Sequence, residues 1–307
     1  MTKITESNPE SILARLRNLA RSSYPNLPLN LMLTLYAQQG LLARLEASPY
    51  RERFVLKGAL SLFARYRQTA RPTEDIDLAA RDLPNTLPAV VSVFEHLCVV
   101  PYPDGLTFEP ATITARVINE TLEYPGVSLL VRVALGRSRV ALQLDVSFGN
   151  AITPEPTSMA FPALLISDPV RVRVYPLETV IAEKFAALVE IGEATTRMKD
   201  LYDLYTILER ETFQSSLMGR AFERSFTARQ TPRSDVATIL SNDFASSSDL
   251  TRRWRQYRTR TGLIAPELPI VMGRIRAFCT PLLLELDPAE RRWNPDGGWL
   301  EEGGHEI

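Results

Sequence analysis

The chain has 307 residues, which is room for two domains of ordinary size, and its 35 basic and 36 acidic residues give a formal net charge of −1. A hydrophobic content of 45% and a charged content of 23% exclude a wholly disordered chain. No apolar run approaches the roughly 20 residues that a membrane span needs, and residues 1–10 have no signal-peptide character. We therefore expect a cytoplasmic protein without a membrane partner.

Residues 1–50 contain two stretches in which apolar residues recur at helical spacing, separated by a breaker at residues 25–28. We expect these two helices to pack on the core that follows. Residues 54–56 form a short apolar strand that leads through Gly58 into a further helical stretch. Residues 75–78 are predicted to form the next strand.

Further strands are predicted between residues 127 and 175. Two alternating runs within 127–148 flank a turn at 136–138 and indicate a hairpin. Residues 153–169 are rich in proline and are interpreted as a connection, whereas valine and arginine alternate over 170–174 as in a strand. Residues 51–175 are therefore predicted to form an α+β core.

The pattern after Pro176 is helical until about residue 286, and residues 176–293 are predicted to form an all-helical domain. The tail at 294–307 contains four glycines and is expected to be mobile.

Cysteine and histidine are too rare to build the common nucleophilic or zinc-binding sites. The two cysteines, Cys98 and Cys279, lie far apart in the sequence, which favours a reducing compartment over a disulfide scaffold. His305 falls in the tail, and His96 falls on a predicted helix, where we expect a surface residue. Because a histidine-ligated zinc site or a Ser-His-Asp triad lacks its main component, an enzyme of this composition would depend on carboxylates, lysine and arginine.

The strongest chemical signal is the pair Asp75 and Asp77. Residues two apart on a strand point to the same face, with Cα atoms about 6–7 Å apart, so Ile76 and Leu78 face the other side and can be buried. Asp145 lies on the polar side of another predicted strand. Converging carboxylates repel each other unless a cation lies between them, and Mg²⁺ with substrate phosphates suits such oxygen ligands. The alternative is a set of ordinary solvent-exposed acids.

A second signal is the predicted turn at Gly58 between a strand and a helix. Glycine lets another group approach the backbone closely, and the free N–H groups at the start of a helix attract phosphate. The turn is therefore predicted to complete a phosphate-binding site.

The third signal is Lys184 on the helix after Pro176. The apolar stripe of that helix consists of Leu177, Val180, Ile181, Phe185 and Leu188. Lys184 lies inside this stripe, so it must either reach solvent or pair with an anion, which would be a nucleotide phosphate or a carboxylate. Asp200 on the next helix could be that partner or could act on an attacking hydroxyl. Asp200 and Asp203 could also be first-turn acids that favour the helix dipole.

Several ordered blocks make the sequence similar to a known family. The blocks are residues 54–60, 71–78, 144–147, 178–184 and 197–204. Together they resemble the AbiEii/AbiGii nucleotidyltransferase family, the toxins of type IV toxin–antitoxin systems that include the mycobacterial MenT group. The similarity covers about residues 11–286.

The resemblance implies a polymerase-β-like nucleotidyltransferase core with a mixed sheet, followed by an all-helical C-terminal domain. It also implies that Asp75 and Asp77 hold Mg²⁺, that Asp145 completes this acidic triad, and that Lys184 binds the nucleotide's phosphates. Asp200 falls on the family's functionally important acidic position. All five residues are therefore assigned to the catalytic site.

The nucleotide-binding turn implied by the resemblance comprises Lys57, Gly58, Ala59 and Ser61. The wider superfamily usually has glycine or serine after the first glycine, followed by a hydroxyl residue. Here Ala59 takes that place, and Ser61 offers a hydroxyl one position later.

Members of the family transfer a nucleotide from an NTP. For MenT-like toxins the acceptor is the 3′ end of tRNA, which stops translation until a cognate antitoxin relieves the effect. The resemblance therefore implies NTP as substrate, Mg²⁺ as cofactor, and tRNA and an antitoxin protein as partners.

An arginine-rich stretch offers a place for RNA. Between residues 210 and 260 there are ten arginines and five acids, a local excess of five positive charges. The arginines assigned to RNA binding are Arg252, Arg253, Arg255 and Arg258. Their neighbours Trp254 and Tyr257 could stack on single-stranded bases, or they could anchor a helix in the core.

Three other functions compete with tRNA modification. The same chemistry could transfer a nucleotide to a protein hydroxyl, or the chain could be a non-catalytic module that senses nucleotide. A two-metal nuclease is disfavoured because no Asp-x-Lys or Glu-x-Lys triplet follows Asp145, and Lys184 belongs to a helix.

Overall fold

The computed structural model describes residues 8–24, 27–67, 70–119, 123–165, 169–285 and 289–301. The chain divides into two units. The first unit is made of Met1–Asn150 and Pro156–Tyr175, and the second of Ala151–Glu155 and Pro176–Ile307.

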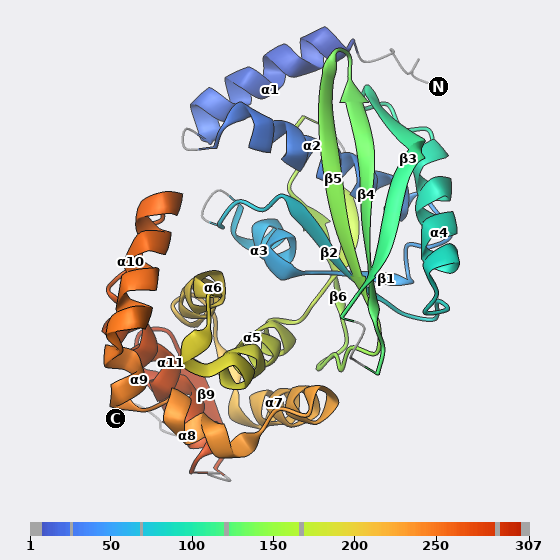
Figure 1. Cartoon of the computed structure of the whole chain (residues 1–307). Helices are drawn as coiled ribbons and strands as arrows, with labels where there is room; N and C mark the ends of the chain where they lie inside the picture. The colour runs from blue at the N-terminus through green and yellow to red at the C-terminus, as the bar shows by residue number, and fades with distance from the viewer. Residues whose placement is uncertain are drawn as a thin grey trace. The chain divides into compact units, whose positions relative to one another are not determined.

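The first unit is built on a seven-stranded mixed sheet with the strand order β3-β4-β5-β2-β1-β7-β6. Its strands are β1 (Phe54–Lys57), β2 (Asp75–Ala80), β3 (Leu106–Ile118), β4 (Gly126–Leu135), β5 (Ser138–Ser147), β6 (Thr157–Phe161) and β7 (Val170–Val174). Its helices are α1 (Pro9–Ser23), α2 (Leu29–Glu46), α3 (Gly58–Tyr66) and α4 (Leu87–Val99). Helix α4 lies along β3 (Figure 1).

Local sequence explains several of these boundaries. Helix α1 begins where Asn8 accepts a hydrogen bond from the backbone N–H of Glu10, with Pro9 in the first turn. The β4–β5 hairpin turns at Gly136, whose φ of 57° lies in the left-handed region that favours glycine. The predicted N-terminal helices, the strand–helix turn at Gly58 and the hairpin are confirmed.

Strands β3 and β6 are not predicted by the sequence pattern. Both lie at edges of the sheet, and most of their residues are at least partly exposed, so neither shows a clear alternation of buried and exposed side chains. Strand β6 also falls in the proline-rich stretch interpreted as a connection. Edge strands carry a weaker sequence signal because one side of each has no neighbouring strand to select apolar residues.

Helix α2 is the central core helix of the first unit, and it holds a buried ion pair. The guanidinium of Arg44 donates to both carboxylate oxygens of Asp104, at 2.6 and 3.1 Å, and both side chains are almost fully buried. The guanidinium also lies 4.5 Å from the ring centroid of Phe108. This pair ties α2 to the segment that enters β3.

The second unit is mainly helical. Its α-helices are α5 (Leu177–Ile191), α6 (Met198–Leu208), α7 (Ser215–Arg229), α8 (Val236–Ile239), α9 (Asn242–Ser246), α10 (Ser248–Thr261) and α11 (Leu268–Leu283). It also contains a three-stranded sheet in the order β10-β9-β8, formed by β8 (Phe213–Gln214), β9 (Arg291–Asn294) and β10 (Gly298–Glu301). The mixed α+β fold is confirmed, but the prediction that residues 176–293 are all-helical is wrong, because β8 and β9 are strands too short to show a periodic pattern in the sequence.

Part of the tail that the sequence predicts to be mobile forms a strand. β10 pairs antiparallel with β9, and the indole of Trp299 donates to the carbonyl of Phe278 at 2.9 Å while the two rings stack with centroids 5.0 Å apart. The glycines allow the tight turn, since Gly298 has a φ of 78°. Residues 302–307, with His305, lie outside the described residues.

The expectations for cysteine and histidine agree with the structure where it describes them. Cys98 and Cys279 are buried free thiols, and burial raises the pKa of both, that of Cys98 to about 11. His96 is exposed on α4, where its ring meets that of Tyr50 edge-on. No helix among the described residues is long and apolar enough to cross a membrane.

Candidate active site

The acidic residues predicted from separate strands meet in the first unit. β2 and β5 are neighbouring parallel strands, and their register pairs Asp77 with Asp145 and Asp75 with Gln143. Neighbouring strands lie about 4.8 Å apart and paired residues face the same side. Asp77 and Asp145 therefore share one face of the sheet, with Asp75 two residues away on that face.

Burial separates the two sides of these strands. The intervening side chains Ile76 and Leu78 are buried, as is Leu144 of β5, whereas Asp77 and Asp145 are partly exposed. The expected alternation is thus confirmed. The apolar residues attach the strands to the core, and this attachment holds the carboxylates at the solvent side.

A lysine continues the row of paired residues across the sheet. β1 pairs antiparallel with β2, and its last residue, Lys57, lies opposite Asp77. The side chain of Lys57 is half-buried, with Nζ 5.9 Å from the ring centroid of Tyr175. Asp77 therefore has a basic neighbour on one side and Asp145 on the other.

Gly58 allows the turn after β1 to pass directly beside Asp77. Its φ is 62°, and a Cβ atom at this position would lie 1.9 Å from Oδ2 of Asp77. Both the backbone conformation and the lack of space therefore require glycine. The predicted close approach at this turn occurs, and the group that approaches is the carboxylate of Asp77.

Helix α3 begins at this glycine without a side-chain cap on its first turn. Ala59 and Ser61 are buried, and the hydroxyl of Ser61 donates to the carbonyl of Gly58 at 2.8 Å. The Ser61 hydroxyl thus stabilises the turn. The hydrogen-bond donors at this turn are the free backbone N–H groups of the first turn of α3 and the ammonium of Lys57.

The donors on this face suit a magnesium ion that is also coordinated by phosphates. Asp77 and Asp145 supply hard carboxylate oxygens from adjacent strands, and Mg²⁺ is usually held by one or two carboxylates plus substrate phosphates. Within the described ranges, no group of three or more His, Cys, Asp or Glu side chains is positioned to hold a metal ion. The side chain of Asp75 therefore does not form a three-carboxylate metal site together with Asp77 and Asp145.

The second unit contains the predicted lysine in an ionic cluster. Lys184 Nζ lies 2.5 Å from Oδ1 of Asp200 and 2.9 Å from Oδ2 of Asp203, and Arg197 Nε lies 2.5 Å from the other oxygen of Asp200. The side chains of Lys184, Asp200 and Asp203 are only 11%, 5% and 2% exposed. Sequence analysis left a phosphate or a carboxylate as the anion that pairs with Lys184, and in the structure the partners are carboxylates.

The cluster has a clear electrostatic consequence for Asp200. Burial by itself raises the pKa of this carboxyl, but the charges and hydrogen bonds of Lys184 and Arg197 outweigh burial and lower the pKa to about 2. Asp200 is therefore ionised at neutral pH. With two cations and two carboxylates, the four side chains together carry no net charge.

The aromatic residues beside the arginine run belong to the core of the second unit. Trp254 and Tyr257 are buried on α10, their rings stack 5.9 Å apart, and the indole of Trp254 donates to the carbonyl of Pro266. They are not available to stack on bases, so the alternative that they anchor a helix is confirmed.

The arginines assigned to RNA binding are largely engaged within the protein. Arg253 donates to the carbonyls of Glu193 and Thr195 at 2.7 and 3.1 Å. Arg252 pairs with Asp249 at 2.8 Å, and Arg258 pairs with Glu267 at 2.6 Å. Arg255 is exposed on α10.

Sequence analysis missed two glutamines, of which Gln143 contacts the acidic site and Gln38 contacts the segment before β2. Gln143, on the same side of β5 as Asp145, donates to Asp145 Oδ1 at 3.5 Å. Gln38 of α2 is fully buried and donates to the carbonyl of Thr73, two residues before β2. The alternation that identified Asp145 could have indicated Gln143. Gln38 has no local signal, because its role depends on a contact between distant segments.

A nucleotidyl transferase family model matches most of the chain. The protein with this glycine turn, these paired carboxylates and this mixed sheet is therefore of the nucleotidyltransferase class. More specifically, the chain belongs to the family described as nucleotidyl transferase AbiEii toxin of type IV toxin–antitoxin systems, whose model matches residues 40–278. The resemblance seen in the sequence is thereby confirmed.

Two solved structures from Helicobacter pylori are similar to the chain. JHP933 is 17% identical, with 85% of this chain and 94% of that chain covered and a TM-score of 0.49. A second structure, described as a candidate nucleotidyltransferase, is also 17% identical, with coverages of 85% and 99% and a TM-score of 0.49. No curated protein matches the sequence.

Proposed function

We propose that this protein is a Mg²⁺-dependent nucleotidyltransferase toxin that transfers a nucleotide from an NTP to the 3′ end of tRNA and so blocks translation. Membership of the AbiEii family supports nucleotide transfer and a toxin–antitoxin role. The observation that carries the chemistry is the register that pairs Asp77 with Asp145, beside a turn that only Gly58 can form.

In the proposed reaction, the 3′-hydroxyl oxygen of the acceptor forms a bond to the α-phosphorus of the NTP, and the bond to the leaving pyrophosphate breaks. Asp77 and Asp145 would hold the metal, which when bound neutralises the triphosphate and the leaving group. The proton of the hydroxyl passes to a carboxylate, for which Asp145 and Asp200 are both candidates. Asp200 is the less suitable of the two, because a carboxylate whose pKa is lowered to about 2 is a weak base.

The role proposed for Lys184 is to bind the phosphates of the NTP. Its ammonium contacts Asp200 and Asp203, so a phosphate would share the lysine with these carboxylates. The same contacts offset the cost of burying the ammonium. Lys57 beside Asp77 is the second cation proposed to meet the nucleotide.

The proposed partners are tRNA and a cognate antitoxin protein. The type IV toxin–antitoxin family supports the antitoxin. For tRNA, exposed Arg255 and the surface ion pair of Arg252 offer contacts to phosphate. Such contacts depend on charge and need no stacking on the buried aromatic residues.

Incubation of the purified protein with total tRNA, Mg²⁺ and each α-labelled NTP in turn tests the proposal. We expect label on the 3′ end of tRNA with release of pyrophosphate, and loss of both when EDTA is added. Label on lysate protein and none on tRNA would favour transfer to a protein hydroxyl. Binding of NTP without transfer to either acceptor would favour a nucleotide-sensing module.

A further inference from the structure

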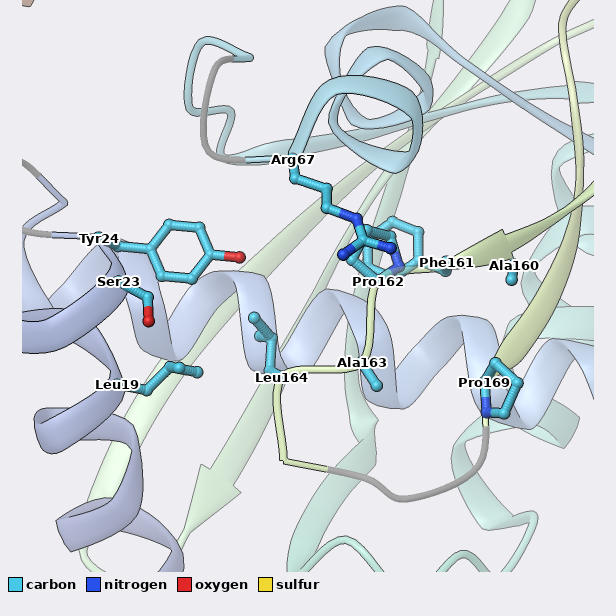
Figure 2. Close-up of a pocket in the computed structure, with 10 residues that line it drawn as sticks. All are labelled: Leu19, Ser23, Tyr24, Arg67, Ala160, Phe161, Pro162, Ala163, Leu164 and Pro169. Carbon is cyan, nitrogen blue, oxygen red and sulfur yellow. The ribbon is translucent and has the colours of Figure 1, made fainter.

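A cavity in the first unit lies away from the acidic face, at the opposite end of α3. Its volume is about 380 Å³, within the range of small-ligand sites. It is bordered by the end of α1, by Arg67 directly after α3, and by the end of β6 with the loop that follows (Figure 2). The nine residues of α3 separate it from Gly58 by about 13 Å.

The walls of this cavity are apolar. Leu19 of α1, Phe161 of β6 and Leu164 of the following loop line it, together with two prolines and two alanines of β6 and that loop. Phe161 and Leu164 are themselves buried, so they are fixed by the core rather than free to move away. Such walls suit the flat apolar body of a small ligand.

The described polar side chains of the cavity are one guanidinium and two neutral hydroxyls, all of which can donate hydrogen bonds. Arg67 contributes a permanent positive charge, and none of the lining residues that the structure describes is acidic. Figure 2 shows the hydroxyl of Tyr24 directed into the space that Arg67 and Leu164 border. Ser23 adds a second hydroxyl at the same end of α1.

Tyr24 remains a donor at neutral pH. Burial raises the pKa of its hydroxyl, and the nearby charge of Arg67 only partly opposes this effect. A protonated phenol and a guanidinium both donate and neither offers a negative charge. The described side chains therefore offer donors and one positive charge, which favours a ligand that carries acceptors and a negative charge.

The backbone at Arg67 is unusual in a way that concerns this cavity. Arg67 ends α3 with a φ of 52°, a region that side-chain-bearing residues seldom adopt. Backbone conformations of this kind are strained and cluster at functional sites. Here the residue with this conformation lines the same cavity as Phe161 and Pro162 (Figure 2).

We propose that this cavity, which we call the Arg67 pocket, binds a small organic anion with a carboxylate or phosphate head group on a flat apolar body. The head group accepts hydrogen bonds from Arg67 and Tyr24, and the body packs against Leu19, Phe161 and Leu164. The binding needs neither NTP nor the acidic face, so it can be measured whether or not the chain transfers nucleotides.

The test is a ligand-observed NMR titration of the full chain with benzoate, phenyl phosphate and benzamide, the neutral analogue of benzoate. We expect saturable binding of at least one anion, with the tighter one identifying the head group, and weaker binding of benzamide. Arg67→Gln should weaken the anion roughly tenfold, as for loss of a hydrogen bond to a charged group. Arg116→Gln, which removes an exposed arginine of β3, should leave it unchanged.

Ala163→Trp separates a true pocket from simple attraction to a surface charge. Ala163 is exposed on the rim, so the indole can fill the cavity while the charge of Arg67 remains, and we expect the anion to be lost. An unchanged thermal midpoint would show that each variant is folded. The proposal would be overturned if neither anion bound saturably or if benzamide bound equally tightly. It would also be overturned if Arg67→Gln or Ala163→Trp bound the anion as tightly as the wild type.

Discussion

Asp77 and Asp145 occupy paired positions on the neighbouring parallel strands β2 and β5, although 68 residues separate them in the chain. Parallel pairing makes their carboxylates neighbours on one face of the sheet. Two such groups repel each other, and the repulsion favours a bound cation. This relationship is the basis of the proposed metal-dependent chemistry.

Neutralising either carboxylate should abolish transfer. We expect Asp77→Asn and Asp145→Asn each to lower the rate by at least about a hundredfold, the scale of losing a preorganised electrostatic group. Thermal stability should be unchanged or slightly higher, because a like-charge neighbour is removed. Transfer of labelled NTP to tRNA and a thermal melt measure both effects.

Glu74→Gln is the matched control for these variants. Glu74 is exposed and directly precedes β2, so it changes the net charge by the same amount beside the same strand. Its activity should stay within about twofold of wild type, as for most surface substitutions. If Asp77→Asn were equally active, the assignment of the acidic face would be wrong.

Gly58→Ala should disturb the site more than an ordinary glycine substitution. At Gly58 the added Cβ would lie 1.9 Å from Asp77 Oδ2, and the alanine would also be strained by the positive φ. Gly262 also has a positive φ, of 66°, but a Cβ there would have no atom within 4 Å. We expect Gly262→Ala to cost about 1 kcal/mol of unfolding free energy. Gly58→Ala should cost clearly more and lower activity as well.

Denaturant unfolding of both glycine variants measures the difference. Equal losses of stability would show that the approach of Asp77 to the turn is not tight in solution. Retained nucleotide transfer in Gly58→Ala would contradict the role of this turn in the site.

Removing the charge of Lys184 should destabilise the second unit. Lys184→Met leaves Asp200 and Asp203 buried without their shared cation, and breaking a buried pair costs roughly 3 kcal/mol. Lys199→Met is the control, since Lys199 is exposed on the same helix as both carboxylates. Unfolding free energies of the two variants at pH 7 should differ by about that amount.

The same cluster predicts a dependence of stability on pH. The pKa of Asp200 falls from an ordinary 3.8 to about 2 on folding, so its stabilisation is fully present above pH 3.8 and is lost as the pH falls through 2. This amounts to about 2 kcal/mol. The stability difference between wild type and Asp200→Asn should therefore shrink by about that much between pH 5 and pH 2.

Asp296→Asn provides the reference for other acids that titrate in the same range, because Asp296 is exposed. Its difference from wild type should change little over this interval. A difference between wild type and Asp200→Asn that did not vary with pH would mean that Lys184 and Arg197 do not hold the pKa of Asp200 low.

The buried pair of Arg44 and Asp104 should behave as a coupled unit in the first unit. Arg44→Leu or Asp104→Leu leaves one buried charge without its partner and should cost roughly 3–5 kcal/mol of unfolding free energy. The double variant removes both charges and should be less destabilised than the sum of the single variants. Additive losses in denaturant unfolding would show that the two side chains do not interact.

Local patterns sufficed for much of the fold and for the identity of the acidic residues. The alternation around Asp77 and Asp145 is local, because side chains on a strand point to opposite faces in turn. The strand–helix turn at Gly58 and the position of Lys184 inside an apolar stripe are local features of the same kind. Edge strands such as β6 were not predicted, because partial exposure weakens the alternation of buried and exposed side chains.

The sequence by itself determined which face of its strand or helix each candidate site residue occupies. Only the tertiary structure decided that Asp77 pairs with Asp145, that the ammonium of Lys184 meets Asp200 and Asp203, and that Trp254 is buried. Periodicity along a segment reflects the geometry of that segment alone. Register and burial depend on contacts between segments far apart in the chain, which folding brings together.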